Sequence, residues 1–140
     1  RSIVTARQFA PRDQLRTEAK RLGYDLPVYG GGPNASLEIL QERGTRTIAA
    51  SIRAHGTGKN LQCFSKALIA NVPGQGAQFE QMLGRLHRQG QKSDEVRFEL
   101  YQHCLQARGD FAQARSDARY IERTTGTRQK LCYANYEGDL

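Results

Sequence analysis

The segment KALIANVPGQGAQFEQMLGRLHRQGQKSDEVRFELY, residues 66–101, decides the fold predicted for this chain. It opens with an apolar run typical of a buried strand (66–72), continues with a stretch of helical periodicity (77–88) and closes with an alternating run (96–101). The helical stretch has one apolar face at the i, i+3, i+4, i+7 spacing, formed by Phe79, Met82, Leu83 and Leu86. A strand, a helix and a second strand in this order predict a right-handed crossover between parallel strands.

The same alternation continues upstream of this segment. Strands are predicted at 2–6, 26–29 and 47–51, and amphipathic helices at 11–23 and 35–43. Pro11 stands at a helix start and Gly23 at a helix end, which is the usual placement of both residue types. The chain is therefore predicted to form an α/β three-layer domain with a mainly parallel sheet covered on both faces. Such sheets bind ligands at the carboxyl ends of their strands, so the loops that follow strands come first in a search for chemistry.

Downstream of residue 101 the sequence predicts one more helix, at 107–123. Phe111, Ala114, Ala118 and Ile121 form its apolar side, and four arginines share an adjacent side: Arg108, Arg115, Arg119 and Arg123. This arginine face is either the solvated surface of a packed helix or a stripe that contacts phosphates. The last segment, 124–140, is mixed, and its run 131–133 is compatible with a short strand.

Size and charge restrict the function classes. With 140 residues the chain is expected to form one compact domain, and its net charge of +7 favours an anionic partner such as nucleic acid. No apolar run approaches the roughly 20 residues that span a bilayer, and no signal pattern opens the chain. We therefore expect a soluble, intracellular protein with no membrane partner. The chain starts at Arg1 without Met, which suggests a piece of a longer protein.

The cysteines and histidines suggest no metal centre. Cys63, Cys104 and Cys132 are far apart and form no C-x-x-C pair, so neither a disulfide framework nor a zinc site is predicted. We expect reduced thiols that are buried or incidental. His55 and His103 have no metal-ligand partner at suitable spacing, and no metal site is predicted.

The stretch SIRAHGTGKNLQ, residues 51–62, contains Gly-Thr-Gly-Lys and resembles the end of a phosphate-binding P-loop. A P-loop requires G-x-x-x-x-G-K-[ST]. Here Arg53 stands at the first glycine and Asn60 at the hydroxyl residue, and no Asp-Glu pair follows a strand to hold magnesium. The stretch alone is therefore no ATP-hydrolysing site. Gly56 and Gly58 still free the backbone for close approach to a ligand, although a structural turn without a ligand is the simpler explanation.

The phrase QMLGRLHRQGQ, residues 81–91, gathers side chains suited to phosphate chemistry. On the predicted helix Gln81, Arg85 and Arg88 occupy i, i+4 and i+7, away from the apolar face, and Gly84 leaves room beside them. Two guanidinium groups aimed in one direction suit the oxygens of a transferring phosphoryl group, where an arginine can contribute on the order of a thousandfold in rate. These three polar residues are the predicted catalytic set.

The two phrases share a family resemblance. Q-x-x-G-R-x-H-R-x-G-Q resembles motif VI of superfamily-two helicases, and its His-Arg-x-Gly-Gln ending is similar to that of Swi/Snf-type DNA-dependent ATPases. Residues 51–61 resemble motif V of that branch, whose usual form is S-T-R-A-G-G-x-G-x-N-L. Upstream, residues 3–9 resemble motif IV, and residues 28–31 the short glycine-containing segment that follows it.

The resemblance implies a RecA-like fold and a place in a two-lobe ATP-dependent motor, a helicase or translocase. Residues 1–105 match the C-terminal RecA-like lobe, and residues 106–140 would be a helical extension packed on it. The N-terminal lobe would hold the P-loop and bind most of the ATP with Mg2+, so this lobe alone would be inactive as an ATPase. The His-Arg-x-Gly-Gln ending favours duplex DNA as the track, with RNA as the alternative, and a prokaryotic or viral origin would make the protein cytoplasmic.

The resemblance also assigns roles to single residues. Arg85 and Arg88 match the arginine fingers that reach the nucleotide from across the cleft between lobes, with Gln81 on the same face. Gly58 and Asn60 would couple the nucleotide to nucleic acid, with Asn60 near the ribose. Contacts to the nucleic-acid backbone would come from Thr5, Arg7, Ser51 and Arg53.

Several positions depart from the family pattern. His55 and Lys59 stand where motif V usually has a glycine and an apolar residue, and Gly84 replaces an acidic residue common in Swi/Snf motors. His87 is expected to pack or hydrogen-bond between lobes and to have no catalytic role. A competing hypothesis is a non-enzymatic basic module that binds DNA or RNA with the same fold, chiefly through the arginine face of the helix at 107–123.

Overall fold

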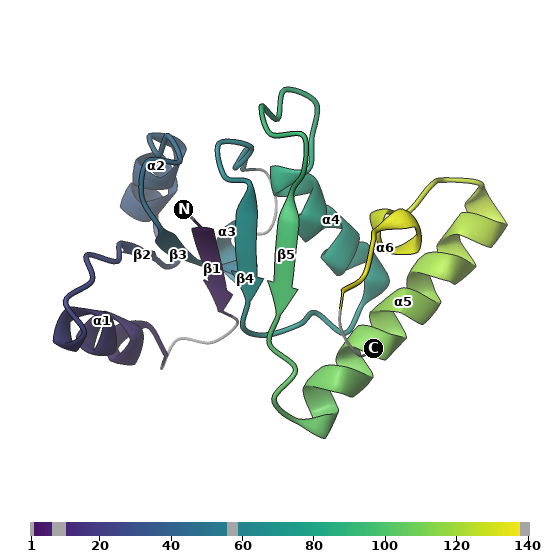
Figure 1. Cartoon of the computed structure of the whole chain (residues 1–140), viewed down its shortest axis with the longest axis horizontal. Coiled ribbons are helices and arrows are strands. Elements are labelled where there is room, and N and C mark those ends of the chain that lie inside the picture. Colours follow the sequence, from purple (N-terminus) through teal and green to yellow (C-terminus); the bar gives the residue numbers. More distant parts are fainter. Residues whose placement is uncertain (1, 7–10, 56–58, 138–140) are drawn as a thin grey trace.

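The computed structural model of the chain describes residues 2–6, 11–55 and 59–137, in which strands and helices alternate as predicted (Figure 1). The strands are β1 (Ser2–Ala6), β2 (Val28–Tyr29), β3 (Ile48–Ser51), β4 (Lys66–Ile69) and β5 (Arg97–Leu100). The helices are α1 (Pro11–Arg21), α2 (Pro33–Leu40), α3 (Ile52–His55), α4 (Gly76–Leu86), α5 (Leu105–Thr125) and α6 (Lys130–Tyr133).

The strands form one parallel sheet in the order β2-β3-β1-β4-β5. β1 lies in the centre, where Thr5 pairs with Ala50 of β3 and with Ile69 of β4. Because all strands run the same way, they end at one edge of the sheet, the carboxyl edge, and begin at the opposite one, the amino edge (Figure 1). The unit β4-α4-β5 is the crossover predicted from residues 66–101.

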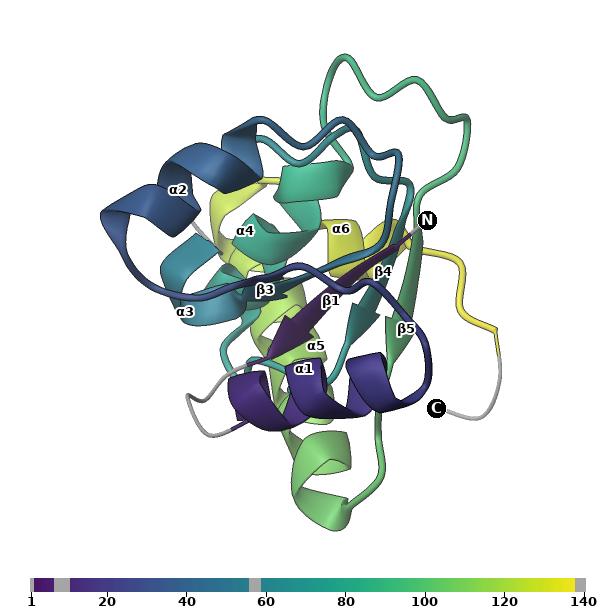
Figure 2. The same ribbon diagram turned by 90° about the vertical axis from the view of Figure 1, so that its left-hand side faces the viewer.

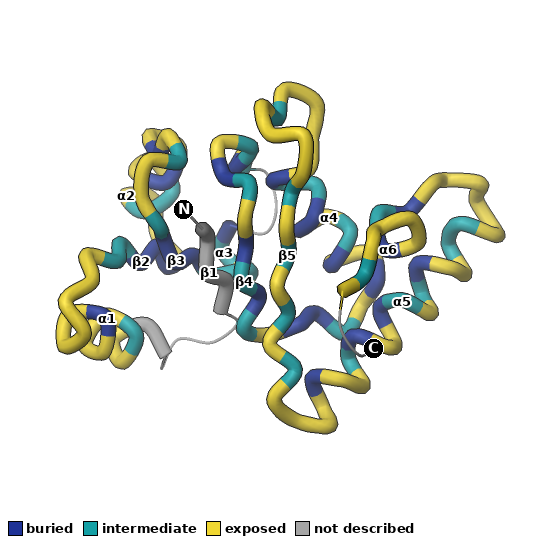
Figure 3. Tube along the Cα trace, viewed as in Figure 1, coloured by how far each residue is buried: buried dark blue, intermediate teal, exposed yellow. Residues whose placement is uncertain are grey.

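One face of the sheet packs against helices α2 and α4. Ile39 of α2 and Leu86 of α4 belong to the same buried cluster as alternate residues of the strands, namely Tyr29, Ile48, Ala50 and Ala67. Figure 2 shows α2, α3 and α4 together on this side of the sheet. Burial is concentrated here, in β3, β4 and the inner side of α4, as the dark segments of Figure 3 show.

The other face of the sheet is unevenly covered. Val28 and Ala49 point to it and are buried, and α1 lies beside this part, where the Arg16 guanidinium donates to the carbonyl of Val28 at 2.9 Å. Farther along the same face, β4 and β5 have exposed charged side chains: Lys66, Arg97 and Glu99. Helix cover on this face is therefore densest at the β2 and β3 end.

Helix α5 packs along α4. The rings of Phe79 and Phe111 lie 5.8 Å apart between the two helices. The backbone N–H of Gly76 donates to the Asp117 carboxylate at 3.1 Å. A Cβ atom at Gly76 would lie 2.7 Å from Cβ of Asp117 and 2.9 Å from the carbonyl oxygen of Ala114. Only glycine allows α4 to begin this close to α5.

The run 131–133 forms part of the helical turn α6, so the possible strand there is wrong. Glu80 of α4 accepts hydrogen bonds from the backbone N–H of Lys130 at 2.8 Å and from its Nζ at 3.1 Å. Leu131 is buried in the cluster between α4 and α5. A carboxylate at the first turn and one buried apolar side chain stabilise a helical turn, whereas a strand would need a neighbouring strand.

Two further features, helix α3 and the exposure of the cysteines, differ from what the sequence predicts. The chain enters α3 directly after β3, where a loop was expected. Cys63, Cys104 and Cys132 are free thiols and all exposed, so they are not buried. None of the helices in the described part of the chain is long and apolar enough to cross a membrane.

Candidate functional site

Residues 51–62 connect the two edges of the sheet. Ser51 ends β3 at the carboxyl edge, opposite Ala6 of β1. Leu61 lies at the amino edge, five residues before Lys66, the first residue of β4. The stretch therefore begins at the carboxyl edge, as expected for a segment that follows a strand, and ends at the amino edge, while Gly56 and Gly58 lie outside the described residues. Because β4 runs parallel to β3, the chain must return to the amino edge before β4 can begin, and α3 starts that return.

Arg85 lies in the last turn of α4, at the amino edge. Its Nη1 donates to the carbonyl oxygen of Lys59 at 3.3 Å, and its own carbonyl accepts a hydrogen bond from the N–H of Leu61 at 3.0 Å. These contacts join the motif V-like stretch to the motif VI-like helix. The structure therefore brings together two segments that the sequence singled out separately.

Arg85 and Arg88 lie close enough for their charges to interact. Burial lowers the pKa of the half-buried Arg85 below its ordinary value, and the positive charge of Arg88 lowers it further. Both effects disfavour the cation, and an anion beside the two guanidinium groups would offset them. The pair is therefore suited to bind a phosphate group, which can accept several charge-assisted hydrogen bonds.

Arg88 is not on the helix, contrary to the predicted i, i+4, i+7 arrangement with Gln81 and Arg85. α4 ends at Leu86, and His87 caps it with non-helical backbone angles. The Gln91 amide donates to the carbonyls of Leu86 and Phe64, both at 3.0 Å. The Leu86 carbonyl thus accepts from the Gln91 amide and from the Arg88 N–H at 3.1 Å, whereas in a longer helix it would accept from the N–H four residues on.

The other predicted nucleotide-site residues also lie near the amino edge. Gln81 is exposed on α4, one turn before Arg85. Asn60 is exposed, and its Oδ1 accepts a hydrogen bond from the N–H of Gln62 at 3.3 Å. The Asn60 carboxamide can therefore offer its NH2 group to a ligand. Gly58 lies outside the described residues.

The predicted nucleic-acid contacts belong to the carboxyl edge. Ser51 is half-buried at the end of β3, and Arg53 is exposed in α3. Thr5 is the fourth residue of the central strand β1 and pairs with Ala50. Arg7 lies outside the described residues. The register thus places Thr5 next to the strand that leads to Ser51 and Arg53.

His55, the last residue of α3, is buried at a position where motif V usually has glycine. Its side chain is 2% exposed, and its Nε2 lies 2.7 Å from the carbonyl oxygen of Gly30. Because a carbonyl only accepts, Nε2 must bear the proton. Burial lowers the pKa of His55, and the nearby Lys59 charge lowers it further, although the bond to Gly30 opposes both. Among the described residues, Nδ1 has no hydrogen-bond partner.

Sequence reasoning missed two contacts that tie this region together. The Lys59 ammonium donates to the carbonyl of Ser36 in α2 at 3.4 Å, which explains why a lysine is accommodated where the family has an apolar residue. The Gln91 side chain joins α4 to the segment before β4. No periodicity signals either contact, because the partners are 23 and 27 residues away.

Among the described residues, Arg85 helps to line a cavity that is too small for a nucleotide. A cavity of about 20 Å³ lies between the sheet, α3 and α4, with His55 and Arg85 among its mostly apolar lining. This volume holds no more than about one water molecule. A nucleotide that contacts Arg85 would have to bind at the surface. The described residues contain no group of three or more His, Cys, Asp or Glu that could hold a metal ion.

No protein-family model matches the chain, whereas its fold is shared with solved structures of two other proteins. The C-terminal part of the Fun30 ATPase domain is 21% identical with a TM-score of 0.61, over 71% of this chain and 34% of that one. The C-terminal domain of Dbp5 from S. cerevisiae, solved bound to Gle1 and IP6, is 15% identical with a TM-score of 0.61, over 86% and 68%. This chain thus spans about a third of the Fun30 chain. The likeness confirms the predicted RecA-like α/β fold.

Proposed function

We propose that this chain is the C-terminal lobe of an ATP-dependent helicase or translocase of superfamily two, related to the Swi/Snf branch and acting on DNA. The observation that carries the proposal is the pair Arg85 and Arg88 at the amino edge, which repel each other in the isolated chain. The contacts of Arg85 to Lys59 and Leu61 support it, because they couple this pair to the motif V-like stretch.

In the full-length protein, an N-terminal RecA-like lobe would bind most of the ATP with Mg2+, which would neutralise phosphate charge. Arg85 and Arg88 would donate hydrogen bonds to the outer phosphate oxygens from across the cleft, where negative charge redistributes in the transition state. Gln81 would face the same cleft, and the Asn60 amide would donate to the ribose. This lobe alone would be inactive as an ATPase.

At the carboxyl edge the chain would hold the nucleic-acid backbone. Thr5, Arg7, Ser51 and Arg53 would contact phosphates without reading bases. Because residues 51–62 run from this edge to Arg85, opening and closing of the two lobes would move both sites together. We assign residues 1–105 to the lobe and residues 106–140 to an extension, which the packing of α5 on α4 supports.

The test replaces each arginine finger in the full-length protein. Arg85→Ala and Arg88→Ala should each lower nucleic-acid-stimulated ATP turnover on the order of a thousandfold, because arginine fingers contribute at that scale. Arg43→Ala, which removes an exposed arginine at the end of α2, is the matched control and should keep wild-type turnover. Wild-type turnover in both finger variants would exclude the assignment.

A second candidate, a non-enzymatic DNA- or RNA-binding module, has its own support on α5. Arg108, Arg119 and Arg123 are exposed there, whereas Arg115 is half-buried and lies over the rings of Phe111 and Tyr136. Under this hypothesis affinity would fall steeply with salt, and removal of the three exposed arginines would weaken binding. Changes at Arg85 and Arg88 would leave this binding unaltered.

A further inference from the structure

Two aromatic rings stack on each other just beyond the end of β5. The ring centroids of Tyr101 and His103 lie 4.6 Å apart with 21° between their planes. Tyr101 is 56% exposed and His103 is exposed as well. The N–H of Tyr101 donates to the carbonyl of Ile69 at 3.0 Å, so the sheet fixes the backbone of this pair. A stacked pair uses one face of each ring, which leaves other ring surface in contact with solvent.

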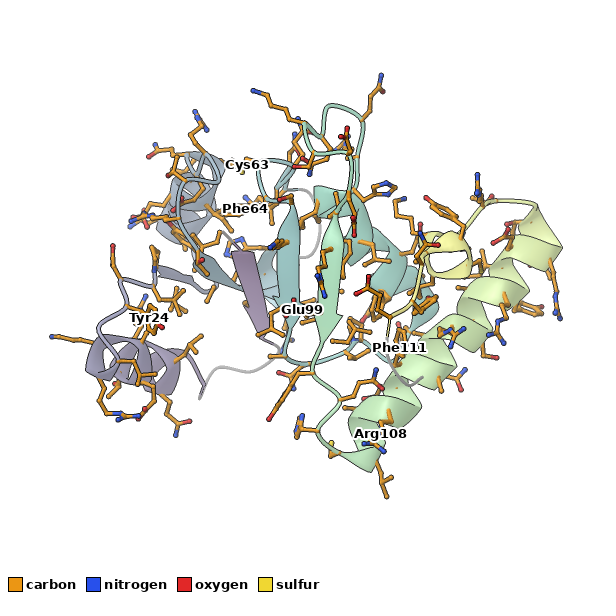
Figure 4. All side chains as sticks on the ribbon, viewed as in Figure 1. Tyr24, Cys63, Phe64, Glu99, Arg108 and Phe111 are labelled. Atoms are coloured by element: carbon orange, nitrogen blue, oxygen red, sulfur yellow. The ribbon has the colours of Figure 1, made fainter. Side chains whose placement is uncertain are left out.

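An arginine lies directly beside the stacked pair. The Nε of Arg108 lies 3.5 Å from the carbonyl oxygen of Gln102, the residue between the two aromatic side chains. Figure 4 labels Arg108 in the first turns of α5, below the end of β5. The nearest described acidic group on this part of α5, Asp110, accepts a hydrogen bond from the Gln106 amide at 2.8 Å. The cluster Tyr101-His103-Arg108 therefore combines aromatic surface with a positive charge.

The cluster lies on the same edge as the proposed backbone contacts. Tyr101 follows β5, and Ser51 and Arg53 follow β3, so all three lie at the carboxyl edge. β1 and β4 separate β3 from β5. Three strand spacings amount to about 14 Å, a distance that a short stretch of single-stranded nucleic acid can span.

We propose that Tyr101, His103 and Arg108 form a stacking site for an unpaired base of the nucleic acid whose backbone Arg53 contacts. This inference rests on the proposed function, because it extends the proposed track along the same edge. Every base has a flat π surface, so stacking on exposed aromatic rings is tolerant of sequence. The guanidinium of Arg108 would add an attraction to the base or to the adjacent phosphate. The site would therefore favour single-stranded over fully paired nucleic acid.

The test measures binding of the full-length protein to three probes: a single-stranded oligonucleotide, the same strand with abasic positions, and a blunt duplex. Tyr101→Ala and His103→Ala should each weaken binding to the intact single strand about tenfold, because stacking on one aromatic side chain contributes at that scale. Tyr101→Phe retains the ring and should bind like wild type. Tyr120→Ala removes a tyrosine that is 69% exposed on α5 and should change nothing.

The probes separate stacking from other losses. Wild type should bind the abasic strand as weakly as Tyr101→Ala binds the intact one, and Tyr101→Ala should bind the blunt duplex like wild type. Unchanged single-strand binding by Tyr101→Ala, or an equal loss on all three probes, would overturn the stacking site. Arg53→Ala tests the underlying function independently. Weaker binding by Arg53→Ala with unchanged binding by Tyr101→Ala removes only the stacking site, whereas the reverse pattern removes the backbone contact and leaves the stacking site.

Discussion

The amino edge and the carboxyl edge of the sheet are constructed differently. At the amino edge, residues 59–64 and 85–91 are joined by hydrogen bonds that involve Arg85, Leu61 and Gln91. At the carboxyl edge, the side chains with a proposed role, such as Arg53 and Tyr101, are exposed. One edge is held in place before any ligand arrives, while the other presents exposed groups to solvent.

This difference matches two kinds of chemistry. Transition-state stabilisation depends on donors that are fixed in advance, because any reorganisation during the reaction adds to the barrier. Backbone binding to a long polymer depends on reach and charge, and it must release as readily as it forms. The two edges can therefore be tested separately, by removing hydrogen bonds at the amino edge and by removing a positive charge at the carboxyl edge.

The substitution Gln91→Leu tests the hydrogen bonds of the amino edge most directly. This change removes the amide that donates to the carbonyls of Phe64 and Leu86. The Leu86 carbonyl keeps its hydrogen bond from the Arg88 N–H, whereas the part-buried Phe64 carbonyl loses the bond from Gln91. We expect the free energy of unfolding to fall by about 2 kcal/mol. Urea unfolding measures it, and Gln89→Leu, at an exposed neighbour, is the control. An equal loss in both variants would show that the contact contributes nothing specific.

A smaller effect is expected from discharging the carboxyl edge with Arg53→Ala. Loss of one phosphate contact should weaken nucleic-acid binding about fivefold and reduce the slope of log affinity against log salt by about one. Lys92→Ala removes an exposed charge at the amino edge and should alter neither quantity. If the two variants lose affinity equally, the contrast between the edges does not hold for binding.

The smallest expected effect concerns His55, which joins the end of α3 to the residue after β2 through its hydrogen bond to Gly30. Its pKa is lowered by burial, so the unfolded chain binds a proton more readily than the folded one. The contribution of His55 to the free energy of unfolding is complete above pH 6.5, the ordinary pKa of histidine. It is lost as the pH falls from 6.5 towards the lower pKa of His55 in the folded chain. The charged groups near His55 are Lys59 and Arg85.

The measurement is unfolding by urea at several pH values between about 7.5 and 5. His55→Gln retains a side-chain donor for the Gly30 carbonyl without titrating, so its stability should depend less on pH than that of wild type. The pKa of the Glu42 carboxyl is lowered from its ordinary 4.5, so this group titrates below the window. Parallel pH profiles for the two proteins would show that His55 is not the group responsible.

Local patterns predicted the fold well, and contacts distant in sequence account for what they missed. Residues 66–101 form the expected strand, helix and strand, because their periodicity reflects a face that is buried in the structure. At the end of α4, the Leu86 carbonyl accepts from the Arg88 N–H and the Gln91 side chain, and at the start of α6 the Lys130 N–H donates to Glu80, a partner 50 residues away. Neither set of contacts produces a periodic pattern in the sequence.

The candidate site shows the same contrast between what local patterns predict and what distant contacts decide. The resemblance identified residues 51–62 and 81–91 as two separate motifs, and the structure brings Lys59 and Leu61 into contact with Arg85. The position of Arg88 was predicted by extending an ideal helix, which failed because side chains decide where a helix ends. The stacked rings of Tyr101 and His103 were missed, since two aromatic residues in a loop have no periodic pattern.

The two glycines of α4 predict opposite mutational tolerance. Gly76 is confined by Asp117 and Ala114, so a library of single substitutions selected for folding should retain glycine at this position. At Gly84 a Cβ atom would meet no heavy atom within 4 Å, so alanine should be accepted there and should stabilise the helix by about 0.5–1 kcal/mol. If the same library, selected for ATP turnover, rejects alanine at position 84, we infer that a group from outside this chain occupies the space beside Gly84 during turnover.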